Sequence, residues 1–288
     1  MTGGWGAPKL VPNHGNGKVD LVLARTNPKS GSMDVSDVVR SGPNHVHALI
    51  THPDGSTEDC GISRNLLTNI GRDWWSQAWG FINAGGQGTP ATTVTSSALT
   101  ATGTPWTASN LATPQLGLAG LRVYVPVTGI TTAPVYANII SNTTSVATLD
   151  QWWTAADGVG TTPANTNSFI IAPGGQAAAR FVALTTDSGA ASASDTVLAT
   201  EITTANCGRA LGTYAHTYGQ STLTLTKSFS VTGTLTAIHK AGLFSSLTQG
   251  GTTAALGGPM IYETVLNQDA TVGNGDTLTL TWTFTLSG

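Results

Sequence analysis

The sequence predicts a mainly β fold: an antiparallel β-sandwich, of jelly-roll or immunoglobulin-like type, with one packed amphipathic helix and an extended N-terminal arm. Threonine alternates with apolar residues through 277–286, which places Leu278, Leu280 and Trp282 on one face of a strand and the threonines on the other. Similar segments follow one another with turn residues and no helical stretch between them, a pattern typical of antiparallel sheets. Because threonine is β-branched and uncharged, a threonine face can meet water or another polar surface without burying a charge.

The composition indicates a protein whose surface carries little charge. Charged residues make up 9% of the chain, against roughly 25% of an average soluble domain. Sheet edges usually carry charges that prevent edge-to-edge pairing, so we expect neighbouring subunits or long loops to cover the edges of this protein. Permanent assembly is one interpretation, and a secreted β-domain that is merely rich in threonine, glycine and alanine is the other.

Several partner classes find no support in the sequence. The net charge of −3 and the pI near 6.0 give no basic footprint for nucleic acid or for polybasic attachment to a membrane. No apolar run approaches the roughly 20 residues of a membrane-spanning helix. The first residues lack the basic and hydrophobic regions of a secretory signal. Cys60 and Cys207 are the two cysteines, and we expect both to be free thiols.

The N-terminal residues differ from the rest of the chain. Residues 1–20 are rich in glycine, proline and asparagine and show no hydrophobic period, so we expect an extended arm that is ordered by neighbouring chains, with Trp5 as a candidate contact. Residues 21–288 are expected to form one sandwich domain.

One segment has helical periodicity. Leu66, Ile70, Trp74 and Ala78 recur every four residues, which predicts a helix over 63–82 with Ser63 as its N-cap. Adjacent Trp74 and Trp75 point about 100° apart on a helix, so both cannot lie at the centre of its apolar face. Residues 83–115 and 150–175 are expected to be long surface loops that contact a neighbour.

The remaining elements are expected to be strands, and their alternation or β-branched content predicts each of them. In chain order the strands are expected at 19–25, 45–51, 121–127, 135–140, 180–185, 208–214, 222–231, 235–244, 260–265 and 277–286. The sequence Asn274-Gly275-Asp276 supplies the chain reversal before the last strand.

No catalytic or metal-binding pattern emerges. His45 and His47 would share a strand face with His52 nearby, but no acidic or cysteine partner stands at ligand spacing, and no HExxH sequence occurs. We therefore predict no metal or other cofactor. Neither a nucleophile with a base nor a paired carboxylate can be singled out, so the prediction is a protein that is not an enzyme.

The tryptophans offer an alternative based on glycan binding. Trp106, Trp152 and Trp153 fall in the expected loops, where their rings could stack on a host glycan. Tryptophan more commonly lies in a core or in a subunit interface, and Trp282 alternates onto the apolar face of its strand.

An ordered set of segments resembles a family of tailed-bacteriophage virion proteins. The resemblance lies in 65–74, 181–187, 208–217, 225–229, 240–244 and the closing strand Asn-Gly-Asp-Thr-Leu-Thr-Leu-Thr-Trp-Thr at 274–283. It covers about 62–80 and 178–288 and leaves out the arm and both expected loops.

The resemblance implies a structural role on the virion, assembled in the host cytoplasm. A homo-oligomeric capsid decoration protein that binds the major capsid protein or other virion proteins is the leading expectation. A tail or tail-fibre component that contributes to tail assembly or binds a host-surface glycan is the alternative. The absence of sequence repeats and heptads disfavours a long fibre shaft.

Overall fold

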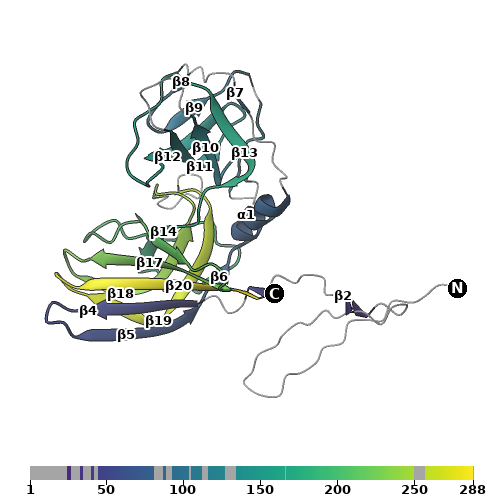
Figure 1. Ribbon diagram of the computed structural model, residues 1–288. Coiled ribbons are helices and arrows are strands. Elements are labelled where there is room, and N and C mark those ends of the chain that lie inside the picture. Colours follow the sequence, from purple (N-terminus) through teal and green to yellow (C-terminus); the bar gives the residue numbers. More distant parts are fainter. Residues whose placement is uncertain are drawn as a thin grey trace. The chain divides into compact units, whose positions relative to one another are not determined.

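The structure is a computed structural model that describes residues 25–26, 33–34, 40–41, 45–80, 87–88, 93–103, 105–111, 116–126, 134–165, 167–249 and 257–287. The described fold is mainly β, with 51% strand, one helix and antiparallel sheets, consistent with a β-sandwich (Figure 1). The expected arm over 1–20, including Trp5, lies outside the described residues.

The chain divides into two compact units, residues 1–42 with 286–288 and residues 43–285. The first unit contains the antiparallel pair β1 (Arg25–Thr26) and β2 (Met33–Asp34), and β3 (Arg40–Ser41), which pairs with the last residues of β20. The division differs from the boundary at residue 20 expected from composition.

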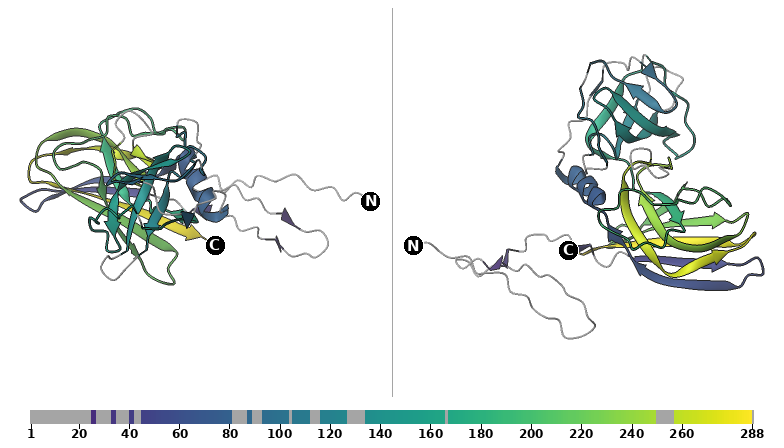
Figure 2. Two further views of the ribbon diagram at one scale, coloured as in Figure 1. Left: turned by 90° about the horizontal axis from the view of Figure 1, so that it is seen from above. Right: turned by 180° about the vertical axis from the view of Figure 1, so that it is seen from behind.

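The first sheet of the second unit is built around the threonine-rich strand. Its strands are β16 (Thr213–His216), β17 (Thr222–Ser230), β20 (Thr277–Ser287), β4 (His45–Thr51) and β5 (Thr57–Arg64), in that order across the sheet. Neighbouring strands are antiparallel, and β20 lies between β17 and β4. Figure 2 shows β4 and β5 side by side from a second direction, as their pairing requires.

The second sheet supplies the other half of the sandwich. Its order is β15 (Ala210–Leu211), β14 (Phe181–Thr185), β18 (Leu235–Phe244), β19 (Met260–Val272) and β6 (Leu66–Leu67). The strands expected at 180–185, 222–231, 235–244, 260–265 and 277–286 are confirmed, since each coincides with a strand of one of the two sheets. The strand expected at 208–214 is interrupted at Gly212, where the chain passes from β15 to β16.

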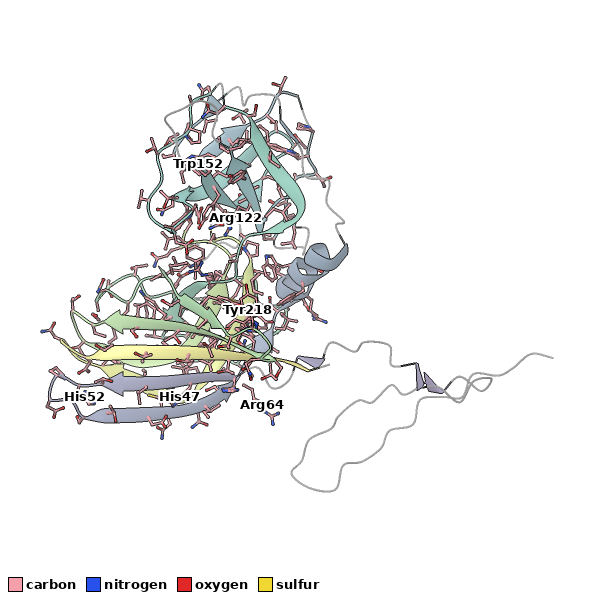
Figure 3. The ribbon with its side chains drawn as sticks, in the orientation of Figure 1. His47, His52, Arg64, Arg122, Trp152 and Tyr218 are labelled. Carbon is pink, nitrogen blue, oxygen red and sulfur yellow. The ribbon has the colours of Figure 1, made fainter. Side chains whose placement is uncertain are left out.

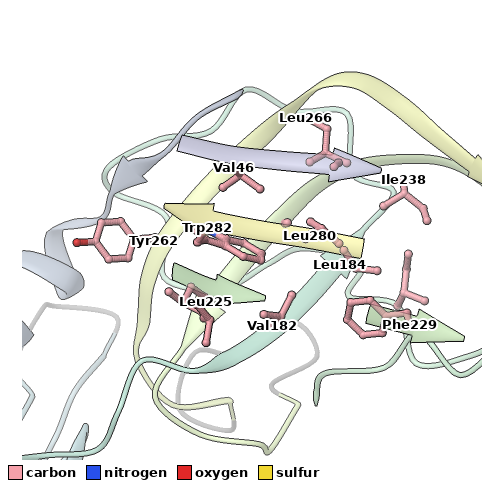
Figure 4. Packing of buried hydrophobic residues seen from close by; sticks show 14 of the residues in the cluster. Val46, Val182, Leu184, Leu225, Phe229, Ile238, Tyr262, Leu266, Leu280 and Trp282 are labelled. Carbon is pink, nitrogen blue, oxygen red and sulfur yellow. The ribbon is translucent and has the colours of Figure 1, made fainter. Parts of the chain in front are cut away.

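Alternation produces a single apolar cluster from both sheets (Figure 4). From the first sheet it takes Val46, Ala48, Ile50, Leu225, Phe229, Leu278, Leu280 and Trp282, and from the second Val182, Leu184, Ile238, Ala241, Leu243, Ile261 and Leu266. The apolar residues expected on one face of 277–286 therefore form the core, as the pattern predicted.

A third sheet confirms the strands expected at 121–127 and 135–140 and adds strands in residues that were expected to be loops. Its order is β7 (Gln87–Gly88), β13 (Phe169–Gln176), β10 (Leu121–Val125), β11 (Val135–Asn142), β12 (Val146–Thr154), β9 (Ala98–Thr100) and β8 (Thr93–Val94). It has an apolar cluster of its own that includes Leu99, Leu121, Val123, Ile139 and Leu149. The prediction of long loops at 83–115 and 150–175 is wrong where these strands lie. Strands β7, β8 and β9 have two or three residues each and do not differ in composition from a loop, whereas β12 and β13 carry aromatic and aliphatic residues that the prediction overlooked.

The helix α1 spans Asn69–Gly80, so the predicted start at Ser63 is wrong. Ser63 lies in β5, and the following residues form β6, in which Leu66 pairs with Glu263. Thr68 takes the capping role, because its Oγ1 accepts a hydrogen bond of 2.9 Å from the Gly71 amide. A side chain at Gly71 would place its Cβ 2.1 Å from the Ile261 carbonyl oxygen, so glycine permits the close packing of α1 on β19.

The helix also separates the two adjacent tryptophans as predicted. Trp74 is buried and its indole donates to the Gly120 carbonyl, whereas Trp75 is partly exposed and donates to the Tyr262 hydroxyl at 3.1 Å.

The alternation in β20 can be tested with two neighbouring substitutions. Leu280→Ala removes a fully buried side chain and is expected to lower the free energy of unfolding by about 2–5 kcal/mol. Thr281→Ala, one residue later on the outer face, is expected to lower it by less than about 1 kcal/mol. Urea unfolding followed by tryptophan fluorescence measures both, and equal losses would contradict the assigned faces.

Candidate interaction face

Threonine and serine make up most of the outer face of the first sheet, and His45, His47 and Leu49 complete its rows on β4. We call this surface the threonine face and define it by four rows across β17, β20 and β4. The rows are Thr224–Thr283–His45, Thr226–Thr281–His47, Ser228–Thr279–Leu49 and Ser230–Thr277–Thr51. All of these residues are exposed or half-buried, whereas the intervening residues of β20 from Leu278 to Trp282 and of β4 from Val46 to Ile50 are buried.

Hydroxyl groups pair across the strands of this face. Thr226 Oγ1 lies 3.2 Å from Thr281 Oγ1, and Ser228 Oγ lies 2.9 Å from Thr279 Oγ1. Each hydroxyl has one hydrogen to donate and two lone pairs, so a paired hydroxyl keeps the capacity to accept from a partner. The face can therefore make hydrogen bonds to a neighbouring protein without the cost of burying an ion.

Charge is concentrated at the edge strand next to this face. Strand β5 carries exposed Glu58, Asp59 and Arg64, and its pairing with β4 shifts register next to Gly61, whose φ is +82°. Charges and an irregularity on an edge oppose the addition of another strand. The charges and the irregularity therefore oppose strand addition at this edge, and the cover of sheet edges by neighbouring subunits or long loops stays a prediction.

The candidate metal ligands lie apart from one another. His47 Nε2 is 2.8 Å from Asp59 Oδ1, and His52 Nδ1 is 2.9 Å from Asp276 Oδ1 (Figure 3). The Gly61 amide and then His47 lower the pKa of Asp59 by hydrogen bonding. Among the residues that the structure describes, no group of three histidine, cysteine or acidic side chains could hold a metal ion.

Both cysteines are free thiols buried in the sandwich core. Burial raises the pKa of Cys60 and of Cys207, which disfavours the reactive thiolate in each.

The tryptophans selected for glycan contact are core residues. Trp106, Trp152 and Trp153 are 6%, 2% and 5% exposed. Trp152 and Trp153 lie on β12, and their indole nitrogens donate to the Thr95 carbonyl at 2.8 Å and to the Asp150 carboxylate at 3.1 Å. The predicted position of Trp152 and Trp153 in a long loop is therefore wrong. All three rings are buried, so none presents a face to a sugar.

Other aromatic residues are exposed, and the sequence analysis missed them. Tyr218 is 97% exposed in the connection between β16 and β17, and Tyr214 is 50% exposed on β16. The available signal was the Tyr218-Gly219 pair at a turn beside alternating strands, where an aromatic side chain has no core to enter.

A buried ionic cluster anchors the chain that follows β14. Lys240 Nζ lies 2.6 Å from Asp187 Oδ2 and 3.0 Å from Glu263 Oε1. Burial, and secondly a hydrogen bond that the protonated Glu263 carboxyl donates to Asp195, raises the pKa of Glu263 to about 7, although Lys240 opposes the shift. A raised carboxyl pKa is common in active sites, but Glu263 is 1% exposed, so its position suits holding the 187–195 segment against β18 and β19.

No family model, curated protein or solved structure matched this chain in the comparisons made. A search of the described residues found no helix that is long and apolar enough to cross a membrane.

The raised pKa of Glu263 predicts a specific pH dependence of stability. Between the ordinary glutamate pKa of 4.5 and the folded-state pKa of about 7, the folded state binds more protons than the unfolded state. The contribution of Glu263 to the free energy of unfolding is therefore fully present below pH 4.5 and is lost as the pH rises through about 7. Glu263→Gln cannot titrate, so the difference in unfolding free energy between wild type and variant should change across this window and level off above it.

Urea unfolding at half-unit pH steps measures this difference. Asp269→Asn, a substitution on the same strand at an exposed carboxyl, serves as the matched control. A wild-type minus Glu263→Gln difference that stays constant between pH 5 and 8 would rule out the titration.

Proposed function

We propose that the chain is a non-enzymatic structural protein of a bacteriophage virion, most simply a homo-oligomeric capsid decoration protein that stabilises the head. The threonine face is the observation that carries the proposal, because it offers an extended, uncharged surface that hydrogen-bonds without ion burial. The ordered resemblance to tailed-phage virion proteins, which covers about 62–80 and 178–288, supports the same role.

The mechanism of such a protein is adhesion repeated by symmetry. A standard interface buries about 1,600 Å² in total, and apolar area contributes about 25 cal/mol per Å². A closed symmetric lattice repeats each contact, so modest contacts sum to a large resistance to expansion of the shell. Residues 1–20, with Trp5, would add to this as an arm that lies on an adjacent capsid protein.

The finer type of the sandwich is part of the proposal. The chain crosses from the first sheet to the second between β17 and β18 and returns between β19 and β20, while the first long strand, β4, pairs with the last, β20. Crossings of this kind favour a jelly roll over an immunoglobulin-like sandwich, since the hairpins of a jelly roll are shared between facing sheets.

A tail or tail-fibre component that contributes to tail assembly or binds a host-surface glycan is the second candidate. The exposure of Tyr214 and Tyr218 favours it, because open aromatic rings can stack on the apolar faces of sugars. In this role the chain would bind cells as well as particles.

Charge placed on the threonine face tests the proposed interface. The double variant Thr279→Lys and Thr281→Lys puts two ammonium groups where the proposed partner offers no counter-ion. We expect the variant to keep the wild-type melting temperature within a few degrees and to lose at least about tenfold in affinity for phage particles stripped of this protein, a loss of about 1.4 kcal/mol. Co-sedimentation of purified variant with stripped particles gives the affinity.

Thr236→Lys is the matched control, since Thr236 is an exposed threonine on β18 of the other sheet. Wild-type affinity in the double variant would contradict the use of this face, and failure of the wild-type chain to bind particles at all would overturn the virion assignment.

A further inference from the structure

A polar cavity opens beside the second half of β17, where it borders Ser228 and Ser230 of the threonine face. Its volume is about 630 Å³, and its walls come from β17 at 227–230, from the chain at 203–210 and from 247–249. Strand β16 pairs with β17 only as far as Thr226, so the cavity lies where β17 continues without that neighbour. The volume falls within the range of small-molecule sites.

Lys227 brings an uncompensated positive charge to this cavity. It pairs with Leu280 and alternates with Thr226 and Ser228, so its side chain lies on the inner side of the sheet. Its ammonium group lies 5.3 Å from the centre of the Phe229 ring. No carboxylate within the described ranges pairs with it, and burial without a compensating charge lowers its pKa.

The second cation at the cavity is already neutralised. Arg209 makes two hydrogen bonds to the Glu201 carboxylate, at 2.9 and 2.7 Å, and a third to the Gly257 carbonyl at 2.6 Å. Its guanidinium also stacks on Phe244 at 3.5 Å. Among the residues that the structure describes, the cavity therefore presents one positive charge without a carboxylate partner, which matches a ligand with one negative charge better than a doubly charged phosphate.

Neutral groups around Lys227 offer hydrogen bonds to several hydroxyls. The Asn206 amide donates one hydrogen to the Ser230 carbonyl at 2.9 Å, and the Gln249 amide donates one to the Ile202 carbonyl at 3.3 Å. Each amide keeps a second hydrogen and its own oxygen for a ligand. Thr203 and Ser228 add hydroxyl groups, and Phe229 and Leu247 add apolar surface.

The backbone that forms one wall adopts an unfavourable conformation. Ala205 and Asn206 have φ values of +54° and +59°, in the left-handed region that alanine rarely occupies. Such conformations persist where the surrounding structure imposes them and cluster at binding sites. Here the turn holds Asn206 in the cavity wall, where its amide donates to the Ser230 carbonyl of β17.

We propose that this cavity binds an acidic sugar, with the Lys227 ammonium group on the sugar carboxylate and with Asn206 and Gln249 on its hydroxyls. The proposal does not rest on the proposed position on the virion, because it needs only Lys227, Asn206 and Gln249, although Ser228 and Ser230 of the threonine face border the cavity. The competing interpretation is that Lys227 only opposes strand addition at an open edge, and that interpretation predicts no ligand.

Amide NMR titration of the full chain tests the site with sodium glucuronate as the probe. We expect saturable chemical-shift changes confined to 203–210, 227–230 and 247–249. Glucose and sodium acetate should each bind at least tenfold more weakly than glucuronate, because glucose lacks the carboxylate and acetate lacks the hydroxyls. Lys227→Gln should weaken glucuronate binding at least tenfold, and Lys227→Arg should stay within about threefold of wild type because it keeps the charge.

Arg64→Gln is the control for net charge, since it removes an exposed cation from the same sheet, and it should leave binding unchanged. Wild-type-like spectra outside the cavity establish that each variant is folded. No saturable shift, equal binding of acetate and glucuronate, tighter binding of an aspartate-containing tripeptide, or unchanged affinity in Lys227→Gln would each overturn the proposal.

Discussion

The alternation of side chains along β20 is the constraint on which the rest of the structure depends. The strand pairs along most of its length with β17 on one side and with β4 on the other. Its inward residues Leu278, Leu280 and Trp282 are fully buried, and its outward residues are threonines. A slip of one residue in either pairing would expose the apolar set and bury the hydroxyls, so the core selects one register.

The same constraint explains where this chain places its few charges. An uncharged outer face leaves the charged residues available for edges and for internal anchors. Glu58 and Arg64 lie on the open edge at β5, whereas Lys240 and Arg209 are buried with the carboxylates that neutralise them. Asp150 acts similarly in the third sheet, where Asn138 and Trp153 donate to its carboxylate. Because a buried ion without its partner is costly, these pairs fix the segments that carry them.

The sequence predicted the elements in which local pattern and tertiary packing agree. Strands β17 and β20 alternate clearly, and their apolar residues form part of the core. The start of α1 was misplaced because Leu66 and Leu67 fit a helical stripe, although they pair with Tyr262 and Glu263, nearly 200 residues away in sequence. The residues around 66–67 give no indication of a strand partner so far away in the sequence. The cavity at Lys227 was likewise hidden, since it depends on where β16 ends.

The most direct test of the account is cryo-electron microscopy of intact phage particles that contain this chain. The account predicts that Thr279 and Thr281 of β20 face a neighbouring protein on the capsid surface, with hydrogen bonds across the contact and no charged residue of the partner opposite them. A particle in which the threonine face points into solvent while the chain attaches through another surface would contradict it.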